Sequence, residues 1–280
     1  SEAGDLDGDG NDDITGASSI TSIGGAPAVL IRNQDGSTTP LVIGEVGDLG
    51  YGYVQRGNIA VVGESNGVSA TGILLEGSAD ASTSIFGGMY FDNGNSSINA
   101  TDADAIGIDI GNYAQVPTIV NAGTLDVDSL TSSTIINADD DDANNDETIV
   151  GPGGQATALL VREQGSLISI DNSGNIFSTA RGEGNDAYAV RDLSGTLATI
   201  TNSGSIGAAV EDTENGTPFA IDVRSNTSGF TLNNSGQVIG DVYLGTGNDT
   251  VNLTDGDVAG DFFFNTGADT LNLSGDATFT

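Results

Sequence analysis

Two segments near the C-terminal end of the chain carry the same pattern at an offset of 20 residues. Residues 240–253 read GDVYLGTGNDTVNL, and residues 260–273 read GDFFFNTGADTLNL. A fixed period of this length is typical of a chain in which each repeat stacks on the one before it. The period constrains the fold strongly, because a stacked coil needs contacts only with its neighbours.

A looser form of the repeat runs upstream, marked by Asn-Ser/Ala-Gly and, after one residue, an aliphatic side chain. The signal starts at Asn121, Asn172, Asn202 and Asn234, and the last three copies lie 30 and 32 residues apart. A short segment before the signal, such as LISI at 167–170, alternates in polarity. Alternation with period two is typical of a strand with one buried face. The unit therefore predicts strands that meet at an Asn-Gly corner.

The repeat extends over most of the chain. Residues 28–34, AVLIRNQ, match residues 158–164, ALLVREQ. Aromatic residues are 5% of the chain and Trp is absent, which disfavours a thick globular core, while 42 Gly residues supply tight corners. We therefore predict an all-β fold, an elongated parallel β-solenoid over residues 26–280, after an acidic N-terminal segment at residues 1–25.

The charge balance excludes two classes of partner. The chain has 40 acidic residues against six Arg and a formal net charge of -34. Such a surface repels nucleic acid and anionic lipid headgroups, and it suits divalent cations or a salty medium. Solubility alone is the simpler explanation of the same charge. No run of 18 apolar residues is present, so we expect no direct insertion of this segment into a membrane.

The sharpest local motif is DLDGDGNDD at residues 5–13. Asp at relative positions 1, 3, 5 and 9 with Gly at position 6 is the spacing of a loop whose carboxylates converge on calcium. Gly16 stands where a full EF-hand has a bidentate Glu, so the motif resembles the shorter loops of integrin-type and dockerin-type repeats. An acidic N-terminal cap without metal is the alternative. The predicted Ca²⁺ ligands are Asp5, Asp7, Asp9, Asn11 and Asp13.

Two further acidic segments are weaker candidates. Residues 245–251, GTGNDTV, partly match a nonapeptide that binds calcium between coils, but that site needs two adjacent half-sites. An Asp/Thr ladder at the coil corners is the alternative there. The run DDDD at 139–142 belongs to an insertion, residues 138–148, which we predict leaves the coil as a solvated acidic loop.

Catalytic chemistry has little support in the sequence. His, Cys and Lys are all absent, which excludes a Ser-His-Asp triad, a Cys nucleophile, a Schiff base and the usual zinc sites. A pair of carboxylates for glycoside cleavage is formally available. With 40 acidic residues, some pair will lie at a suitable distance by chance.

Two patterns predict how the coils pack. Arg162, Arg191 and Arg224 each follow a Val, so stacking in register would place three guanidinium groups in one row. Such a row needs carboxylates from neighbouring strands or another subunit between the charges. The run Phe262–Phe264 must place at least one ring on the outer face of its strand. We expect the C-terminal end of the solenoid, with these rings and that of Phe279, to be covered by a partner copy or by further sequence.

The blocks at 240–253 and 265–273, with Asn-Ser-Gly corners before them, resemble the passenger region of Gram-negative autotransporters, particularly those of alphaproteobacteria. The resemblance extends from about residue 105 to residue 280. It implies a right-handed β-helix that a C-terminal β-barrel displays outside the cell. Passengers of this kind commonly serve in adhesion or as a stalk.

We therefore expect a non-enzymatic, structural or adhesive solenoid that is extracellular, on the bacterial cell surface. Its expected partners are other copies of itself or a ligand on a host or cell surface. Surface-layer and filament proteins share this composition, so a self-assembling layer or filament bridged by calcium is the alternative. A β-helical polysaccharide-degrading enzyme is the remote one.

Overall fold

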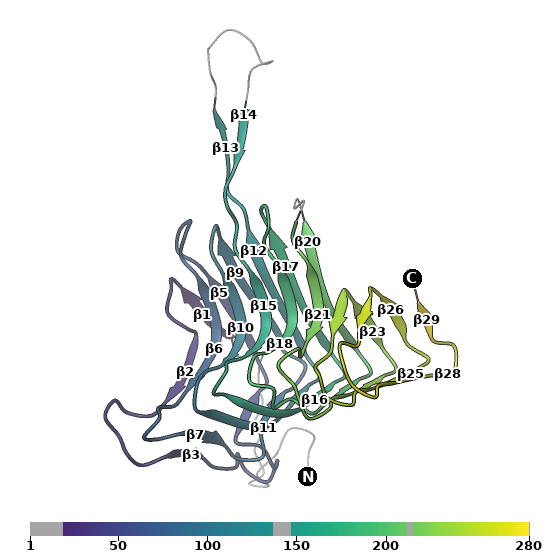
Figure 1. Cartoon of the computed structure of the whole chain (residues 1–280). Helices are drawn as coiled ribbons and strands as arrows, with labels where there is room; N and C mark the ends of the chain where they lie inside the picture. The colour runs from purple at the N-terminus through teal and green to yellow at the C-terminus, as the bar shows by residue number, and fades with distance from the viewer. Residues whose placement is uncertain (1–18, 137–146, 212–214, 280) are drawn as a thin grey trace, which may run out of the picture.

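The computed structural model describes residues 19–136, 147–211 and 215–279. These residues form β-strands, turns and irregular segments, without a helix. The strands lie in three long sheets in which every pairing is parallel, so the predicted parallel β-solenoid is confirmed. The coils stack along one axis from the N-terminal to the C-terminal end of the described chain, as the colours of Figure 1 show.

Each coil contributes one strand to each sheet, with short strands added in the early coils. The nine strands of sheet A, in spatial order, are β1 (Ser19–Ile23), β5 (Asn58–Val62), β9 (Asn95–Thr101), β12 (Thr124–Leu130), β17 (Asn175–Arg181), β20 (Ser205–Glu211), β23 (Gln237–Ile239), β26 (Asp257–Ala259) and β29 (Thr278–Phe279).

The eight strands of sheet B are β2 (Val29–Arg32), β6 (Ala70–Glu76), β10 (Ala105–Ile110), β15 (Ala156–Val161), β18 (Ala187–Asp192), β21 (Pro218–Asp222), β24 (Asp241–Tyr243) and β27 (Phe262–Phe263).

The strands of sheet C are β3 (Leu41–Ile43), β4 (Tyr53–Gln55), β7 (Thr83–Ile85), β8 (Met89–Phe91), β11 (Ala114–Asn121), β16 (Ser166–Asn172), β19 (Thr199–Asn202), β22 (Thr231–Asn234), β25 (Thr250–Thr254) and β28 (Thr270–Ser274).

Sheets A and B lie side by side and pack against each other, while sheet C crosses their lower edge (Figure 1). The core between them is a thin column of Val, Ile, Leu and Ala, as the composition predicted. In β19, for example, Ile200 is fully buried and Thr201 is exposed. The alternation that marked the strands in the sequence therefore reports which side of each sheet faces this column.

The Asn-Gly corners form a ladder inside the solenoid. The amide nitrogens of Asn121, Asn172 and Asn202 each donate to the side-chain oxygen of the Asn in the next coil, at 2.7 Å in all three links. All three are 5% exposed or less, and so is Asn234, which ends the ladder. The predicted corners are confirmed, and the ladder satisfies polar groups that burial would otherwise leave without partners.

The Gly of the corner is required by a close approach between coils. A side-chain carbon built on Gly204 would lie 2.0 Å from the carbonyl oxygen of Gly174 in the preceding coil. Gly236 meets the carbonyl of Gly204 at the same 2.0 Å distance. Any side chain at this corner would therefore push two coils apart and break the Asn ladder beside it.

One insertion leaves the stack. Strands β13 (Ser133–Ile136) and β14 (Glu147–Val150) pair with each other antiparallel, in contrast to the three long sheets. Figure 1 shows this hairpin projecting away from the coils. Most of the predicted acidic loop at 138–148, namely residues up to 146, lies outside the described residues. The hairpin that flanks it was not predicted from the sequence.

Replacing the central ladder residue, Asn202→Ala, should lower the free energy of unfolding by about 2–4 kcal/mol. The change removes four side-chain hydrogen bonds and leaves the buried side-chain oxygen of Asn234 without its donor. The matched control is Thr201→Ala, one residue away on the exposed side of β19, with an expected cost within about 0.5 kcal/mol. Urea denaturation measures both. Equal losses would contradict a stabilising role for the ladder.

Candidate functional site: an arginine and aromatic patch on sheet B

The predicted calcium ligands Asp5, Asp7, Asp9, Asn11 and Asp13 lie outside the described residues, so calcium binding there stays a prediction. Calorimetric titration of the whole chain tests it, because the heat should disappear in an Asp7→Ala, Asp9→Ala variant. A flat titration of the unmodified chain at millimolar calcium would contradict it. Within the described residues, no group of three or more Asp or Glu is placed to hold a metal ion.

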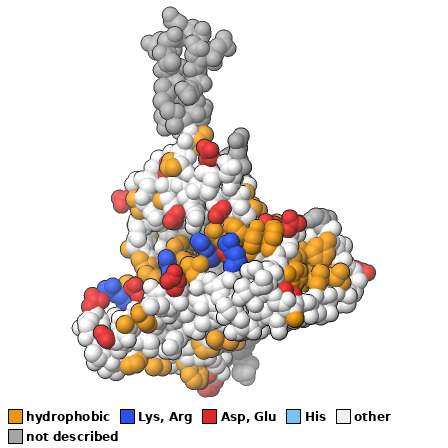
Figure 2. All heavy atoms as spheres, viewed as in Figure 1, with side chains coloured by type: hydrophobic (Ala, Val, Ile, Leu, Met, Phe, Trp, Pro, Cys, Tyr) orange, Lys and Arg blue, Asp and Glu red, His pale blue; other side chains and the backbone are white. Residues whose placement is uncertain are grey.

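The outer face of sheet B brings Arg, Asp and aromatic side chains together. Figure 2 shows the basic side chains near the middle of this face, with hydrophobic side chains beside them. We call this set the arginine–aromatic patch. Its members are Arg162, Arg191, Arg224, Asp109, Asp222, Tyr188, Phe219, Tyr243 and Phe263.

The predicted row of three aligned Arg residues is wrong in register. Arg191 pairs across the strands with Leu160 on one side and with Asp222 on the other, and not with Arg162. The register is set by the inward side chains, because Val190 is fully buried and pairs with Leu159 and Ile221. Placing Arg191 opposite Arg162 would need a slip of two residues, which would move Val190 from Leu159 to Val161 and repack the core.

One of the three Arg side chains, Arg162, pairs with a carboxylate of a neighbouring strand as expected, and the other two do not. The guanidinium of Arg162, just after β15, donates to both oxygens of Asp109 on the neighbouring strand β10, the shortest contact being 2.7 Å. Arg224 donates to both oxygens of Asp222 at 2.7 Å, two residues away in the same segment. Hydrogen bonding to these carboxylates raises the pKa of both Arg side chains.

The aromatic members form a stacked column along the rod. The rings of Tyr188 and Phe219 lie 4.6 Å apart and nearly parallel, and those of Tyr243 and Phe263 lie 4.1 Å apart. Phe219 and Tyr243 join the two pairs at 5.1 Å with tilted rings. Ring pairs in such geometry contribute about 0.5–1.5 kcal/mol beyond the area they bury. The column therefore holds the outer side of sheet B together where the inner side is aliphatic.

Arg191 is held by a ring and not by a carboxylate. Its guanidinium carbon lies 4.1 Å from the centre of the Tyr188 ring, and it donates to the side-chain oxygen of Gln155 at 3.3 Å. Its buried Nε has no hydrogen-bond partner. A cation over a ring face is stabilised by the ring quadrupole, which replaces part of the missing hydrogen bonding.

The column ends in an open groove of about 550 Å³ at the last described coil. Phe263 is 40% exposed there, while Phe262 and Phe264 pack against the core, so the expectation that one of the three rings faces outward is confirmed. The groove combines ring faces with the guanidinium of Arg224. Its lining residues are Arg224, Tyr243, Leu244, Phe262, Phe263, Phe264 and Asn265.

The protonation of the patch favours binding over proton transfer. General acid–base catalysis needs a group whose pKa lies near the working pH. Burial raises the pKa of Tyr188 to about 12, and burial raises that of Tyr243 as well. The lone pairs of Asp109 and Asp222 face guanidinium groups. Both Tyr hydroxyls therefore keep their proton near neutrality and can hold a ligand or a neighbouring strand.

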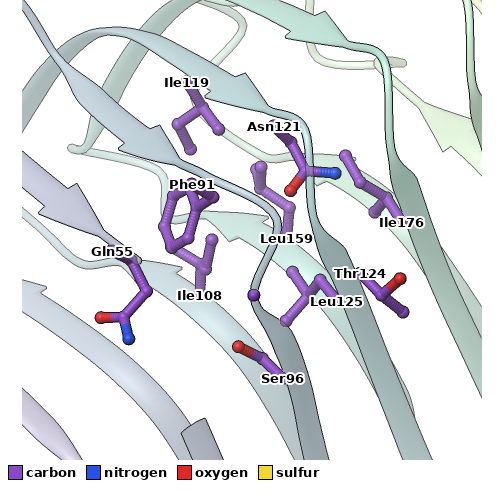
Figure 3. A pocket seen from close by; sticks show the side chains of 11 residues that line it. Gln55, Phe91, Ser96, Ile108, Ile119, Asn121, Thr124, Leu125, Leu159 and Ile176 are labelled. Carbon is purple, nitrogen blue, oxygen red and sulfur yellow. The ribbon is translucent and has the colours of Figure 1, made fainter. Parts of the chain in front are cut away.

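A second cavity lies inside the solenoid and is too small for a ligand. It has a volume of about 10 Å³, room for one water at most and far below the few hundred Å³ of small-molecule sites. Figure 3 shows Phe91 and Asn121 on its wall, from adjacent coils that pair in register. Phe91 stands where later coils have Asn, so the cavity marks the first rung of the Asn ladder.

Asp249 is a buried carboxyl group within the GTGNDTV segment. It is 1% exposed, and its Oδ1 accepts a hydrogen bond from the backbone N–H of Phe230 at 2.7 Å. Its Oδ2 is buried without a partner. Burial raises the pKa of Asp249, and the charge of Asp269 on the next coil raises it further. The two 20-residue copies do lie on adjacent coils, because Thr250 pairs with Thr270, but calcium between them stays a hypothesis.

Comparisons of the chain with known protein families, with curated proteins and with solved structures found no match in any of the three. No helix within the described residues is long and apolar enough to cross a membrane. The arrangement of the side chains is therefore the evidence on which a function for this chain rests.

Asp249→Asn should raise the melting temperature at pH 7, because a neutral amide costs less to bury than a carboxylate with an unpaired oxygen. A pKa raised by folding means that stability is lost as pH rises through the folded value. The gain should therefore shrink as pH falls towards the ordinary Asp pKa of 3.8. Thermal melts from pH 7 to pH 4 measure it.

The matched control for this variant is Asp261→Asn, which removes the same charge from an exposed side chain one coil away. It separates the effect of the buried oxygen from relief of the overall negative charge. An equal gain in both variants would contradict the special position of Asp249. A loss of stability in Asp249→Asn alone, reproduced in the unmodified chain by removing calcium, would point to a bound cation instead.

Proposed function

We propose that this chain is a non-enzymatic structural and adhesive solenoid of a bacterial cell surface, similar to the passenger region of an autotransporter. The observation that carries the proposal is the continuous parallel stack, stabilised from within by the Asn ladder. Such a stack presents long, regular outer faces to its surroundings. A rod of this kind holds binding surfaces at a distance from its base, which is what a stalk or an adhesin needs.

An enzymatic function has one observation in its favour, the groove beside Arg224 with its ring faces. Polysaccharide-cleaving β-helices need a basic side chain beside an aromatic groove, and this groove has both. It lacks a second requirement, an unengaged carboxylate pair, because Asp222 is bound on both oxygens by Arg224. The groove therefore fits recognition of a ligand better than cleavage of a glycosidic bond.

The self-assembling layer or filament is the second candidate, and the last described coil favours it. Phe263, Phe279, Leu271 and Leu273 are between 40% and 58% exposed on this coil. An exposed apolar strand edge is a surface on which another chain can pair. With a net charge of -34, such assembly would need cations between the acidic faces.

A display experiment tests the proposal. Antibodies raised against the purified chain should label intact producing cells as strongly as permeabilised ones, because an external rod is accessible without opening the envelope. A cytoplasmic protein serves as the control for envelope integrity. Labelling that requires permeabilisation would contradict surface display.

Light scattering of the purified chain separates the two candidates. An isolated stalk should keep the mass of a monomer in calcium and in EDTA. A layer or filament bridged by calcium should have a much larger mass in calcium, which EDTA returns to that of the monomer.

A further inference from the structure

The aromatic column of sheet B is covered at one end and open at the other. Arg191 lies over the ring of Tyr188, with 4.1 Å between the guanidinium carbon and the ring centre. Because Phe219 stacks on Tyr188 at 4.6 Å and nearly parallel, the guanidinium must lie on the opposite face of that ring. At the other end, Tyr243 stacks on one face of Phe263. Among the described residues, no ring or guanidinium lies on the other face of Phe263, which is 40% exposed.

The contacts within the column show what its ring faces hold. The other three rings each have a guanidinium within 5.2 Å of their centre. Arg224 serves two of them, at 4.9 Å from Tyr243 and 5.2 Å from Phe219. The face of an aromatic ring attracts a cation, and a flat guanidinium can stack on it while its N–H groups still donate hydrogen bonds. Phe263 is therefore the one ring of the column that lacks the contact which the other three make.

A carboxylate lies beside the open ring. Asp261 precedes Phe263 by two residues, and residues two apart in an extended segment point to the same side. The same spacing of Asp and an aromatic residue occurs at residues 186–188, DAY, and at residues 241–243, DVY. In the first of these, the Tyr hydroxyl donates to the Asp carboxylate at 3.0 Å, so the two side chains do lie together. The open ring therefore has an acceptor next to it for the N–H groups of a cation.

This end of the column carries excess negative charge. Burial raises the pKa of the Tyr243 hydroxyl, and the charges of Asp241 and Asp261 raise it further. Arg224 opposes them, but both oxygens of Asp222 accept its hydrogen bonds and offset its charge. Among the described residues, neither Asp241 nor Asp261 has an ion-pair partner. The groove beside these rings therefore favours a cationic ligand over an anionic one.

A second copy of the chain is a poor source of that cation. The chain has six Arg and no Lys. Three of the six, Arg162, Arg181 and Arg224, are in ion pairs at 2.7–2.8 Å, and Arg191 is held by a ring, which leaves two to offer. Two copies, each with a net charge of -34, also repel each other. A protein with a basic surface is instead attracted to this chain from a distance.

We propose that the open face of Phe263 binds an arginine side chain of a basic partner protein. The guanidinium stacks on the ring, and the carboxylate of Asp261 accepts its N–H groups. The open groove of about 550 Å³ at this coil receives the rest of the side chain. The inference deepens the proposed adhesive function and rests on it, because it names the chemistry by which the adhesin recognises its partner.

Titration of the whole chain with short peptides, followed by NMR, tests the inference. Three peptides share the sequence Gly-Ser-X-Ser-Gly with blocked ends, where X is Arg, Lys or citrulline. Lys keeps the charge without the flat guanidinium, and citrulline keeps the shape of Arg without the charge. The ring resonances of Phe263 should shift with the Arg peptide. That peptide should bind more tightly than the Lys peptide and about twofold or more tightly than the citrulline peptide.

Two pairs of variants assign the effect to the ring and to the carboxylate. Phe263→Leu should lower the affinity for the Arg peptide by about two- to fivefold and remove its preference over the Lys peptide. The matched control Phe86→Leu removes another ring, which is 52% exposed on sheet C, and should leave the affinity unchanged. Asp261→Asn should weaken binding of the Arg and Lys peptides but not of the citrulline peptide. Its control, Asp48→Asn, removes the same charge from an exposed side chain in a distant coil.

Circular dichroism and melting confirm that the variants are folded, and the Phe263 resonances of the unmodified chain do not depend on them. The inference is overturned if these resonances stay fixed, if citrulline binds as tightly as Arg, or if Phe86→Leu loses as much affinity as Phe263→Leu. It is also overturned if the unmodified chain is a dimer that Phe263→Leu makes monomeric, because the ring then belongs to a contact between copies. Surface labelling of intact cells without a preference for the Arg peptide would overturn this inference and leave the proposed function standing.

Discussion

The in-register contact between successive Asn residues is the interaction on which the rest of the structure depends. Asn172 and Asn202 each donate to the next coil and accept from the previous one, so each rung is satisfied only when the coils align residue by residue. A slip by one residue would bury the outward neighbours in place of the Asn side chains. The Gly beside each rung allows the coils to approach closely enough for a 2.7 Å contact. The corner thus aligns and spaces the coils between Asn121 and Asn234.

Because the coils are aligned at the corners and through the core, the chain between corners is free to vary in length. Adjacent coils differ by tens of residues in length, and the β13–β14 hairpin leaves the stack without disturbing the pairing of β11 with β16. The three outer faces consequently differ in chemistry. Sheet B carries the arginine–aromatic patch, and sheet C carries Thr and Asn side chains such as Thr199, Thr231 and Asn233. Sheet A carries acids such as Asp126, whose pKa is raised by burial and by the charge of Asp128.

The inner side of the solenoid was predictable from the sequence, and much of the outer side was not. The Asn-Gly corners and the alternating LISI segment were visible because core positions accept few residue types. The predicted alignment of the Arg residues failed because the Arg side chains lie outside the core, while the buried Val190 fixes the register through Leu159 and Ile221. The Asp222–Arg224 pair was missed although residues two apart on a strand face the same side.

Hydrogen exchange of backbone amides tests the central role of the Asn ladder most directly. The amides of β16, β19 and β22, which pair through Asn172, Asn202 and Asn234, should be the most protected in the molecule. Protection should fall towards β1 at one end of the described solenoid and β28 at the other. If these three strands instead exchange as fast as the end strands, the ladder does not hold the solenoid together and the account is wrong.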